Sequence, residues 1–474
     1  MSTPRESLLL LSDVHLGSDL NDGGHTHPRS SDIDRDLALC LAHYSSLPPA
    51  PGAKRWRLVV VGDFVDFVGM SIDPRPGDAL EGELSESEKG YGLGGRADRV
   101  LLKLARAEER HADVFTSLRV FVAAGNAVTF VQGNHDLELH WDAAQEAFRD
   151  RIAGPDDDAR ARIDFEPWFV HREGLVYVEH GHQYDPFCAV PYVLAPVSPL
   201  EPARVFPSLS DALLRYIVRR TPGMKEYGHE DRGLASYISW GLMLGLRGAA
   251  DLHRRFWECV RMLQDVAAAY DTPAGLVVKR EHEVRLEERA ARTGVPRAKL
   301  EEALALHVPS MVRTPRLVLA SVMLDRLGVF ALALPLLVTL LVLGQWFPAA
   351  IVAVVWLLLH AELSAGRPSV DPAKLMAERA AELVRLFPAS FVVMGHTHVP
   401  DTRDLGAATY VNLGSWAEGE PEQDETNPYR AARTHLVIHE HDDRHEAQLY
   451  AWKEGAPREV RVVARVLAKR TALR

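Results

Sequence analysis

The chain has 474 residues, enough for about two or three domains with a sizeable core. An apolar fraction of 47 % is typical of a folded protein, and a formal net charge of −11 argues against a general nucleic-acid binder, so no nucleic-acid partner is expected. The cysteines Cys40, Cys188 and Cys259 are widely spaced, which predicts a reducing compartment and no disulfide framework. The first apolar run leads directly to Asp13, a pattern typical of a core strand and not of a signal peptide.

Five apolar runs along the chain each end on a short polar motif and have the pattern of a buried strand. They are residues 7–11, 57–62, 127–133, 175–180 and 390–395. Helical patterns lie between them at residues 97–124 and 141–152, and residues 71–96 are typical of a long exposed loop. Further strands are expected after the last motif, at residues 410–413, 435–439 and 446–452. Because open α/β sheets carry their sites at the carboxyl ends of strands, the motifs are expected to meet in space.

The stretch between the fourth and fifth motifs departs from this rhythm. Residues 186–386 are therefore predicted to be an insertion, mostly helical over 206–270 and with two short helices over 285–307. The flanking residues 1–185 and 387–455 would form the two parts of one catalytic domain, followed by a basic tail at 456–474. The insertion also carries a basic cluster, which is either a solvated face or a platform for phosphate or anionic lipid. This cluster comprises Arg215, Arg219, Arg220 and Lys225.

Residues 327–359 contain no Asp, Glu, Lys, Arg or His. A membrane-spanning helix needs about 20 apolar residues, and residues 344–348 interrupt the run with turn-forming side chains, so a hydrophobic hairpin is predicted. Since His180 and His398 must reach one site, the chain would return to the side from which it enters. The basic flanks place that side in the cytosol by the positive-inside rule. They are Arg313, Arg316 and Arg326 before the run and Arg367 and Lys374 after it.

The expected location is thus the cytoplasmic face of the cell membrane. The alternative is a cytoplasmic protein in which the hairpin is buried, either within the insertion or at a dimer interface.

The five motifs consist mainly of Asp, Asn and His, which are hard or borderline ligands for divalent cations. They occupy residues 12–15, 62–66, 133–136, 180–182 and 395–398. Two cations about 3.5–4 Å apart need a bridging carboxylate, and Asp63 is the best candidate because it ends a strand and follows a glycine. Asp13 and His15 are expected to alternate along an extended segment and so to face one metal together. His396 and His398 repeat that spacing, while Asn134 and His180 complete the second site.

Over residues 8–184 and 390–452 these motifs resemble the calcineurin-like metallophosphoesterase superfamily. The resemblance implies an α/β fold, a four-layer α/β/β/α sandwich, interrupted here by the helical insertion with its hydrophobic hairpin. It also implies two divalent metal ions, Mn in the first place with Fe or Zn as alternatives. One metal would be held by Asp13, His15, Asp63 and His398, and the other by Asp63, Asn134, His180 and His396.

The same resemblance implies that His135 is the catalytic histidine, and either Asp66 or Asp136 could orient it. Residues 62–67 and 180–185 are similar to the UDP-diacylglucosamine pyrophosphatase branch, whose members cleave a lipid-linked diphosphate at the membrane surface. That branch has Arg where this chain has His135, and its helical lid is far shorter than this insertion.

The expected activity is that of a metallophosphoesterase, in which a metal-bridging hydroxide attacks a phosphoester or diphosphate. The substrate would be a phosphorylated small molecule, lipid-linked or a nucleotide, met at the cytosolic membrane surface. The alternatives are a soluble (cyclic) nucleotide phosphodiesterase and a catalytically silent membrane scaffold. His182 is expected beside the metal ligands or in contact with substrate. His25 and His27 copy the last motif but lack flanking strands, so they are assigned to a loop near the mouth of the site.

Overall fold

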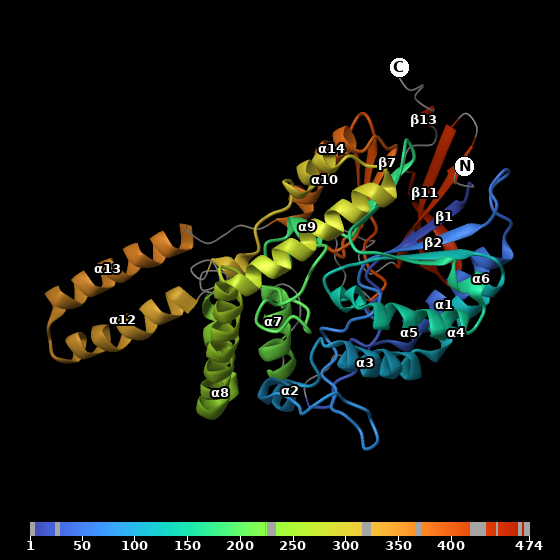
Figure 1. Cartoon of the computed structure of the whole chain (residues 1–474). Coiled ribbons are helices and arrows are strands. Elements are labelled where there is room, and N and C mark those ends of the chain that lie inside the picture. The colour runs from blue at the N-terminus through green and yellow to red at the C-terminus, as the bar shows by residue number, and fades with distance from the viewer. Residues whose placement is uncertain are drawn as a thin grey trace.

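The computed structural model describes residues 5–23, 29–222, 224, 234–314, 324–365, 371–417, 433–441, 444–462 and 467–468. Several residues considered above lie outside these ranges, namely His25, His27, Lys225, Arg316, Arg367 and parts of the 456–474 tail. The described chain is a mixed α/β protein with two mixed sheets (Figure 1).

The first sheet has a parallel half that carries three of the five motifs. Its parallel strands are β1 (Ser7–Leu11), β2 (Trp56–Val61), β3 (Ala127–Val131) and β4 (Ile163–Glu166). On the other side of β1 the sheet continues antiparallel, through β10 (Thr434–Glu440), β11 (Arg444–Lys453) and β12 (Ala456–Val462). The short β13 (Leu467–Ala468) pairs with β11. Parallel pairing of β1, β2 and β3 brings their carboxyl ends, and so the first three motifs, to one edge.

The second sheet carries the other two motifs on neighbouring strands. Its order is β5 (Phe169–Arg172), β6 (Val176–Glu179), β7 (Phe391–Met394), β9 (Thr409–Asn412) and β8 (Asp401–Asp404). Although the predicted insertion separates β6 from β7, the two strands pair in parallel, with Val178 opposite Val393. The chain therefore leaves the sheet after β6 and returns beside the same strand.

Alternating side chains give the two sheets a shared core. Leu8 and Leu10 of β1 belong to the same buried cluster as Val178 of β6 and Val393 of β7, so these faces pack together. The intervening Leu9 points the other way, into a second buried cluster formed with the helices. Those helices are α1 (Ser31–Ser46), α3 (Ala97–Arg110), α4 (Ala112–Ala123) and α5 (Asp142–Ala153). Side chains of β1 alternate between its two faces. Because both faces are buried, the sequence of the strand is continuously apolar.

The predicted insertion is helical and covers the outer face of the second sheet. Its buried side chains share a cluster with Tyr177 of β6, Val392 of β7 and Tyr410 of β9. Its helices are α7 (Leu209–Tyr216), α8 (Leu234–Ala269), α9 (Pro273–Thr293), α10 (Arg297–Leu304), α12 (Leu324–Val342), α13 (Trp346–Ala365) and α14 (Pro372–Leu386). The 3-10 turn η3 (Val218–Arg220) follows α7.

Helices α12 and α13 lie side by side and extend away from the rest of the molecule (Figure 1). Among the described residues, α13 is long and apolar enough to cross a membrane and only 6 % of its apolar window is buried, while residues 328–342 of α12 form a shorter apolar helix. The turn between them ends earlier in the chain than the predicted interruption at 344–348, because α13 begins at Trp346. Pro348 lies in the first turn of α13, where a missing N–H costs no helical hydrogen bond.

The helical prediction for residues 97–124 is confirmed, but the range divides into two helices because His111 leaves helical geometry at φ −116° and ψ 38°. Its ring instead accepts a bond from Gly17 N (2.8 Å) and contacts the Asp34 carboxylate. The expected exposed loop at 71–96 contains α2 (Glu86–Tyr91), which begins with a capping box formed by Ser85 and Glu88.

Candidate metal centre

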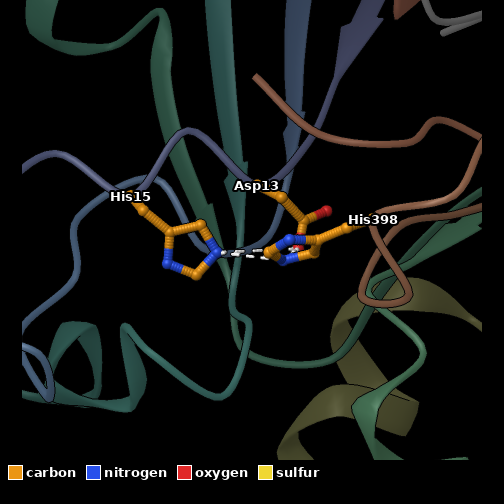
Figure 2. Close-up of side chains that lie close together, drawn as sticks. All are labelled: Asp13, His15 and His398. Atoms are coloured by element: carbon orange, nitrogen blue, oxygen red, sulfur yellow. Dashed lines mark hydrogen bonds and ion pairs between the residues drawn. The ribbon is translucent and has the colours of Figure 1, made fainter. Parts of the chain in front are cut away.

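The side chains of the motifs converge where the strand ends of the two sheets meet. Asp13 and His15 follow β1, and His398 follows β7 and comes from the opposite sheet (Figure 2). His398 Nε2 lies 3.2 Å from Asp13 Oδ1 and 3.3 Å from His15 Nε2. Three potential ligand atoms thus face one point, although 383 positions separate His15 from His398 in the sequence.

The carboxylate of Asp13 is held on one side and unsatisfied on the other. Its Oδ2 accepts hydrogen bonds from Ser12 Oγ and from His396 N. Its Oδ1 is buried and has no hydrogen-bond partner, while it faces the imidazole nitrogens of His15 and His398. A buried carboxylate oxygen without a donor is costly, and a cation at this point would satisfy it.

A second group forms around Asp63 at the end of β2. Asp63 Oδ2 lies 3.2 Å from His180 Nε2 and 3.7 Å from His15 Nε2, so one oxygen faces both groups. His180 Nδ1 donates to Val61 O at 2.8 Å, which leaves its Nε2 toward Asp63 and toward Asn134 Oδ1 at 3.2 Å. This is the orientation expected of a metal-binding histidine whose other nitrogen is held by a backbone carbonyl.

Five of the predicted ligands have left-handed backbone conformations. The φ angles are 54° at Asp13, 51° at His15, 53° at Asp63, 69° at His396 and 58° at His398. Outside this site, only two other non-glycine residues in the described part of the chain have positive φ. The expectation that these pairs lie in extended segments was therefore wrong, although Asp13 and His15 do face one point. These residues lie in tight turns after the strands, each at a cost of about 1–3 kcal/mol that the surrounding fold must offset.

His396 lies beside the second group but its ring nitrogen contacts a residue that the sequence reasoning missed. Its ring centroid is 5.3 Å from that of His180, and its Nε2 is 3.1 Å from Asp185 Oδ2. Asp185, His396 and Cys188 themselves form a group that could hold a metal ion. The available signal was a carboxylate five positions after His180, just before the apolar stretch 186–190.

The structure places His135 against one of its two candidate partners. His135 Nδ1 contacts Asp66 Oδ1 at 2.7 Å. The carboxylate of Asp136 instead accepts hydrogen bonds from Gly133 N (2.6 Å) and Phe64 N (2.9 Å), and so braces two of the motif loops. The geometry favours Asp66 as the partner of His135.

The protonation of these groups follows from burial and charge. Burial alone would lower the pKa of His135, but the carboxylates of Asp66 and Asp63 outweigh it and raise that pKa well above its ordinary value. Burial and the neighbouring Asp63 raise the pKa of Asp136 to about 7. His135 is also the more accessible partner, with 16 % of its side chain exposed against 2 % for Asp66. The imidazole is thus the member of the pair that reaches toward solvent.

His182 lies behind the ligands, with its ring centroid 5.4 Å from that of His180. Burial, followed by the charges of His180 and His396, lowers the pKa of His182 well below its ordinary value. A neutral, buried ring at this position suits a role beside the ligands.

A scan against models of known protein families finds no match for this chain, and a search of curated proteins finds none that is similar. Function is therefore inferred from the residues themselves. Oxygen and imidazole donors around shared carboxylates suit divalent cations such as Mn, Fe or Zn.

The glycine of the second motif provides a test of this geometry. Gly62 has φ +82°, and a Cβ there would overlap the ring of His180. We expect Gly62→Ala to displace His180 and to lower the number of divalent cations bound per chain, measured by elemental analysis after dialysis against Mn²⁺.

The matched control is Gly52→Ala, at nearly the same φ (+84°) but with its nearest neighbour at 3.9 Å. It carries the same backbone strain and should keep full metal content. Equal loss from both variants would mean that strain, and not displacement of His180, is responsible.

Proposed function

We propose that this protein is a metal-dependent phosphohydrolase that cleaves a phosphoester or diphosphate bond. The observation that carries the proposal is the position of Asp63 Oδ2, which faces His15 Nε2 on one side (3.7 Å) and His180 Nε2 on the other (3.2 Å). A shared carboxylate flanked by two ligand groups is the arrangement that a two-cation site requires. We also infer membership of the calcineurin-like metallophosphoesterase superfamily, with the two sheets and their outer helices as its four-layer α/β/β/α sandwich.

Two divalent cations, when bound, supply a water of lowered pKa and neutralise charge on the phosphoryl oxygens. Asp13, His15, Asp63 and His398 would hold one cation, and Asp63, Asn134, His180 and His396 the other. Mn is the preferred candidate, with Fe or Zn as alternatives. The fit depends on Asp13 Oδ1 and Asp63 Oδ2, since both are buried and face imidazole nitrogens.

His135 is positioned to transfer a proton. Since its Nδ1 faces Asp66, its Nε2 is the nitrogen left to donate a proton to the leaving oxygen as the phosphorus–oxygen bond breaks. Asp66 would orient the ring and stabilise its positive charge. The partial exposure of His135 suits a group that meets an incoming phosphate.

We further propose that α12 and α13 anchor the protein at the cytoplasmic face of the membrane. Leu332, Val342 and Phe347 of this hairpin are each at least 78 % exposed, an extent of apolar surface that soluble monomers rarely show. A site held at the bilayer surface suits a lipid-linked substrate, and the phosphohydrolase chemistry equally accommodates a nucleotide.

The proposed two-cation site predicts different losses of metal and of rate for two variants. Asp63→Ala should abolish hydrolysis of an aryl phosphodiester and remove most of the bound metal, because it deletes the shared ligand. His135→Ala should keep the metal but lose about 10²–10⁴-fold in rate, the usual contribution of general acid–base catalysis.

The control is His171→Ala, a half-buried histidine of β5 outside the site, which should keep both metal and rate. Release of the metal by His135→Ala would contradict the separation of roles.

The anchor is tested by replacing residues 327–359 with a short Gly/Ser bridge. The protein should move from the membrane pellet to the soluble fraction, because the apolar arms no longer leave water, while each basic flank residue contributes only about 1 kcal/mol at an anionic surface. Hydrolysis of a small aryl phosphodiester should survive, and hydrolysis of a lipid-linked diphosphate should fall.

As a control, Leu276→Ser with Val277→Ser removes exposed apolar side chains of α9 (65 % and 66 % exposed) outside the hairpin and should leave the protein in the pellet. Wild-type protein that is soluble without detergent would exclude the anchor.

A further inference from the structure

One arginine of the insertion reaches the Asp66–His135 pair. Arg219 of η3 is only 1 % exposed, and its Nη2 lies 3.7 Å from Asp66 Oδ2. It belongs to the basic cluster noted in the sequence, yet its described neighbours there bind elsewhere. Arg215 donates to the carbonyls of Leu93 and Gly92, and Arg220 donates to that of Gly23. Within this cluster, Arg219 is thus the side chain found at the catalytic pair.

Asp66 lies between competing partners. Its Oδ1 accepts a hydrogen bond from Gly69 N at 2.6 Å and contacts His135 Nδ1 at 2.7 Å. Its Oδ2 faces Arg219 Nη2 and, at 3.9 Å, His15 Nδ1. A guanidinium remains charged at any working pH, so Arg219 is a fixed electrostatic partner for Oδ2. It favours the carboxylate orientation in which Oδ1, and not Oδ2, serves His135.

The approach of Arg219 is supported from three sides. Thr221 Oγ1 donates to Ile217 O at 2.6 Å, which closes the turn that carries Arg219. Arg255 of α8 donates to Tyr216 O at 3.1 Å and ties the same turn to the longest helix of the insertion. On the other side, a Cβ at Gly69 would overlap the Asp66 carboxylate and crowd Arg219, so a glycine leaves room for the contact.

We propose that Arg219 is a positioning residue that acts through Asp66 on His135, so that the helical insertion completes the catalytic site. This inference rests on the proposed phosphohydrolase function. In the step concerned, the oxygen of a water that has released one proton to solvent bonds to phosphorus, and the bond from phosphorus to the leaving oxygen breaks. His135 Nε2 gives that oxygen a proton, which the ring regains from solvent. Arg219 does not touch the reacting atoms in this scheme. Its removal should therefore impair proton donation specifically.

The test is a series of aryl phosphodiesters whose leaving groups range from nitrophenol, which departs without a proton, to phenol, which needs one. For Arg219→Met we expect kcat to fall about 10-fold to 100-fold with the phenyl ester, a part of the full contribution of general acid catalysis. With the nitrophenyl ester the fall should be below about 3-fold, and KM should change little with either. A structural defect would lower both rates alike.

A double-mutant cycle gives an independent readout. If Arg219 acts through His135, then Arg219→Met in a His135→Ala background should cost nothing further with the phenyl ester. Additive losses would overturn the proposal. Metal content should stay at the wild-type value in all variants, because the contact of Arg219 is with Asp66, which is not a predicted ligand. Should Arg219→Met fail to fold, Arg219→Gln serves the same two tests, since it removes the charge while keeping a polar side chain of similar length.

Arg289→Met is the matched control. Arg289 is another buried arginine of the insertion (4 % exposed), and it binds Glu166 and the carbonyl of Phe169, away from Asp66. It should show no dependence on the leaving group, and a matching selective loss would contradict the assignment to Arg219. Failure of the proposed function and failure of this inference give different results. Wild-type protein without activity on any ester rejects the proposed function, whereas an active enzyme with a leaving-group-independent Arg219→Met rejects this inference alone.

Discussion

Charge balance among buried carboxylates is the constraint on which the candidate centre depends. Asp13 and Asp63 are both fully buried, and the ionisable side chains nearest to them are histidines. A carboxylate removed from water must be paired, and imidazoles at these distances do so only by taking up protons. Divalent cations would meet the same need while leaving the imidazoles neutral and free to coordinate. The residues therefore favour metal on grounds of electrostatics as well as donor type.

The ligands lie in strained turns at the strand ends, and the surrounding fold offsets this strain. The predicted ligands Asp13, Asp63 and His396 have left-handed backbones that an isolated loop would avoid. Each lies two residues after the end of a strand, and backbone bonds such as Val14 N to Asp63 O (2.9 Å) tie the loops to one another. The turns are thus over-determined by two packed sheets, which is the condition under which local strain persists at a functional site.

The sequence predicted those parts of the fold that carry a periodic signal. The motif-bearing strands fall within two residues of their expected bounds, as with β1 at Ser7–Leu11, because a strand buried on both faces is continuously apolar. The left-handed turns were not predictable, since nothing in Asp-x-His distinguishes a turn from an extended segment. Asp185 and Arg219 were missed as site residues for a different reason. Their contacts are long-range, and neither lies in a motif where its partner is visible.

Among the described contacts between the insertion and the centre, two bear on how its distant helices could influence the site. From α8, Arg255 holds the turn that presents Arg219 to Asp66. From α14, which follows the apolar hairpin in sequence, Met376 packs so closely on Gly181 that a Cβ there would overlap its methyl group. Gly181 lies between His180 and His182, at φ +102°. A displacement of α14 would therefore first move the backbone that orients His180. A displacement of α8 would first change the contact of Arg219 with the Asp66–His135 pair. A hairpin held in a bilayer would constrain α14 most directly, because only a short segment separates α13 from α14 in the chain.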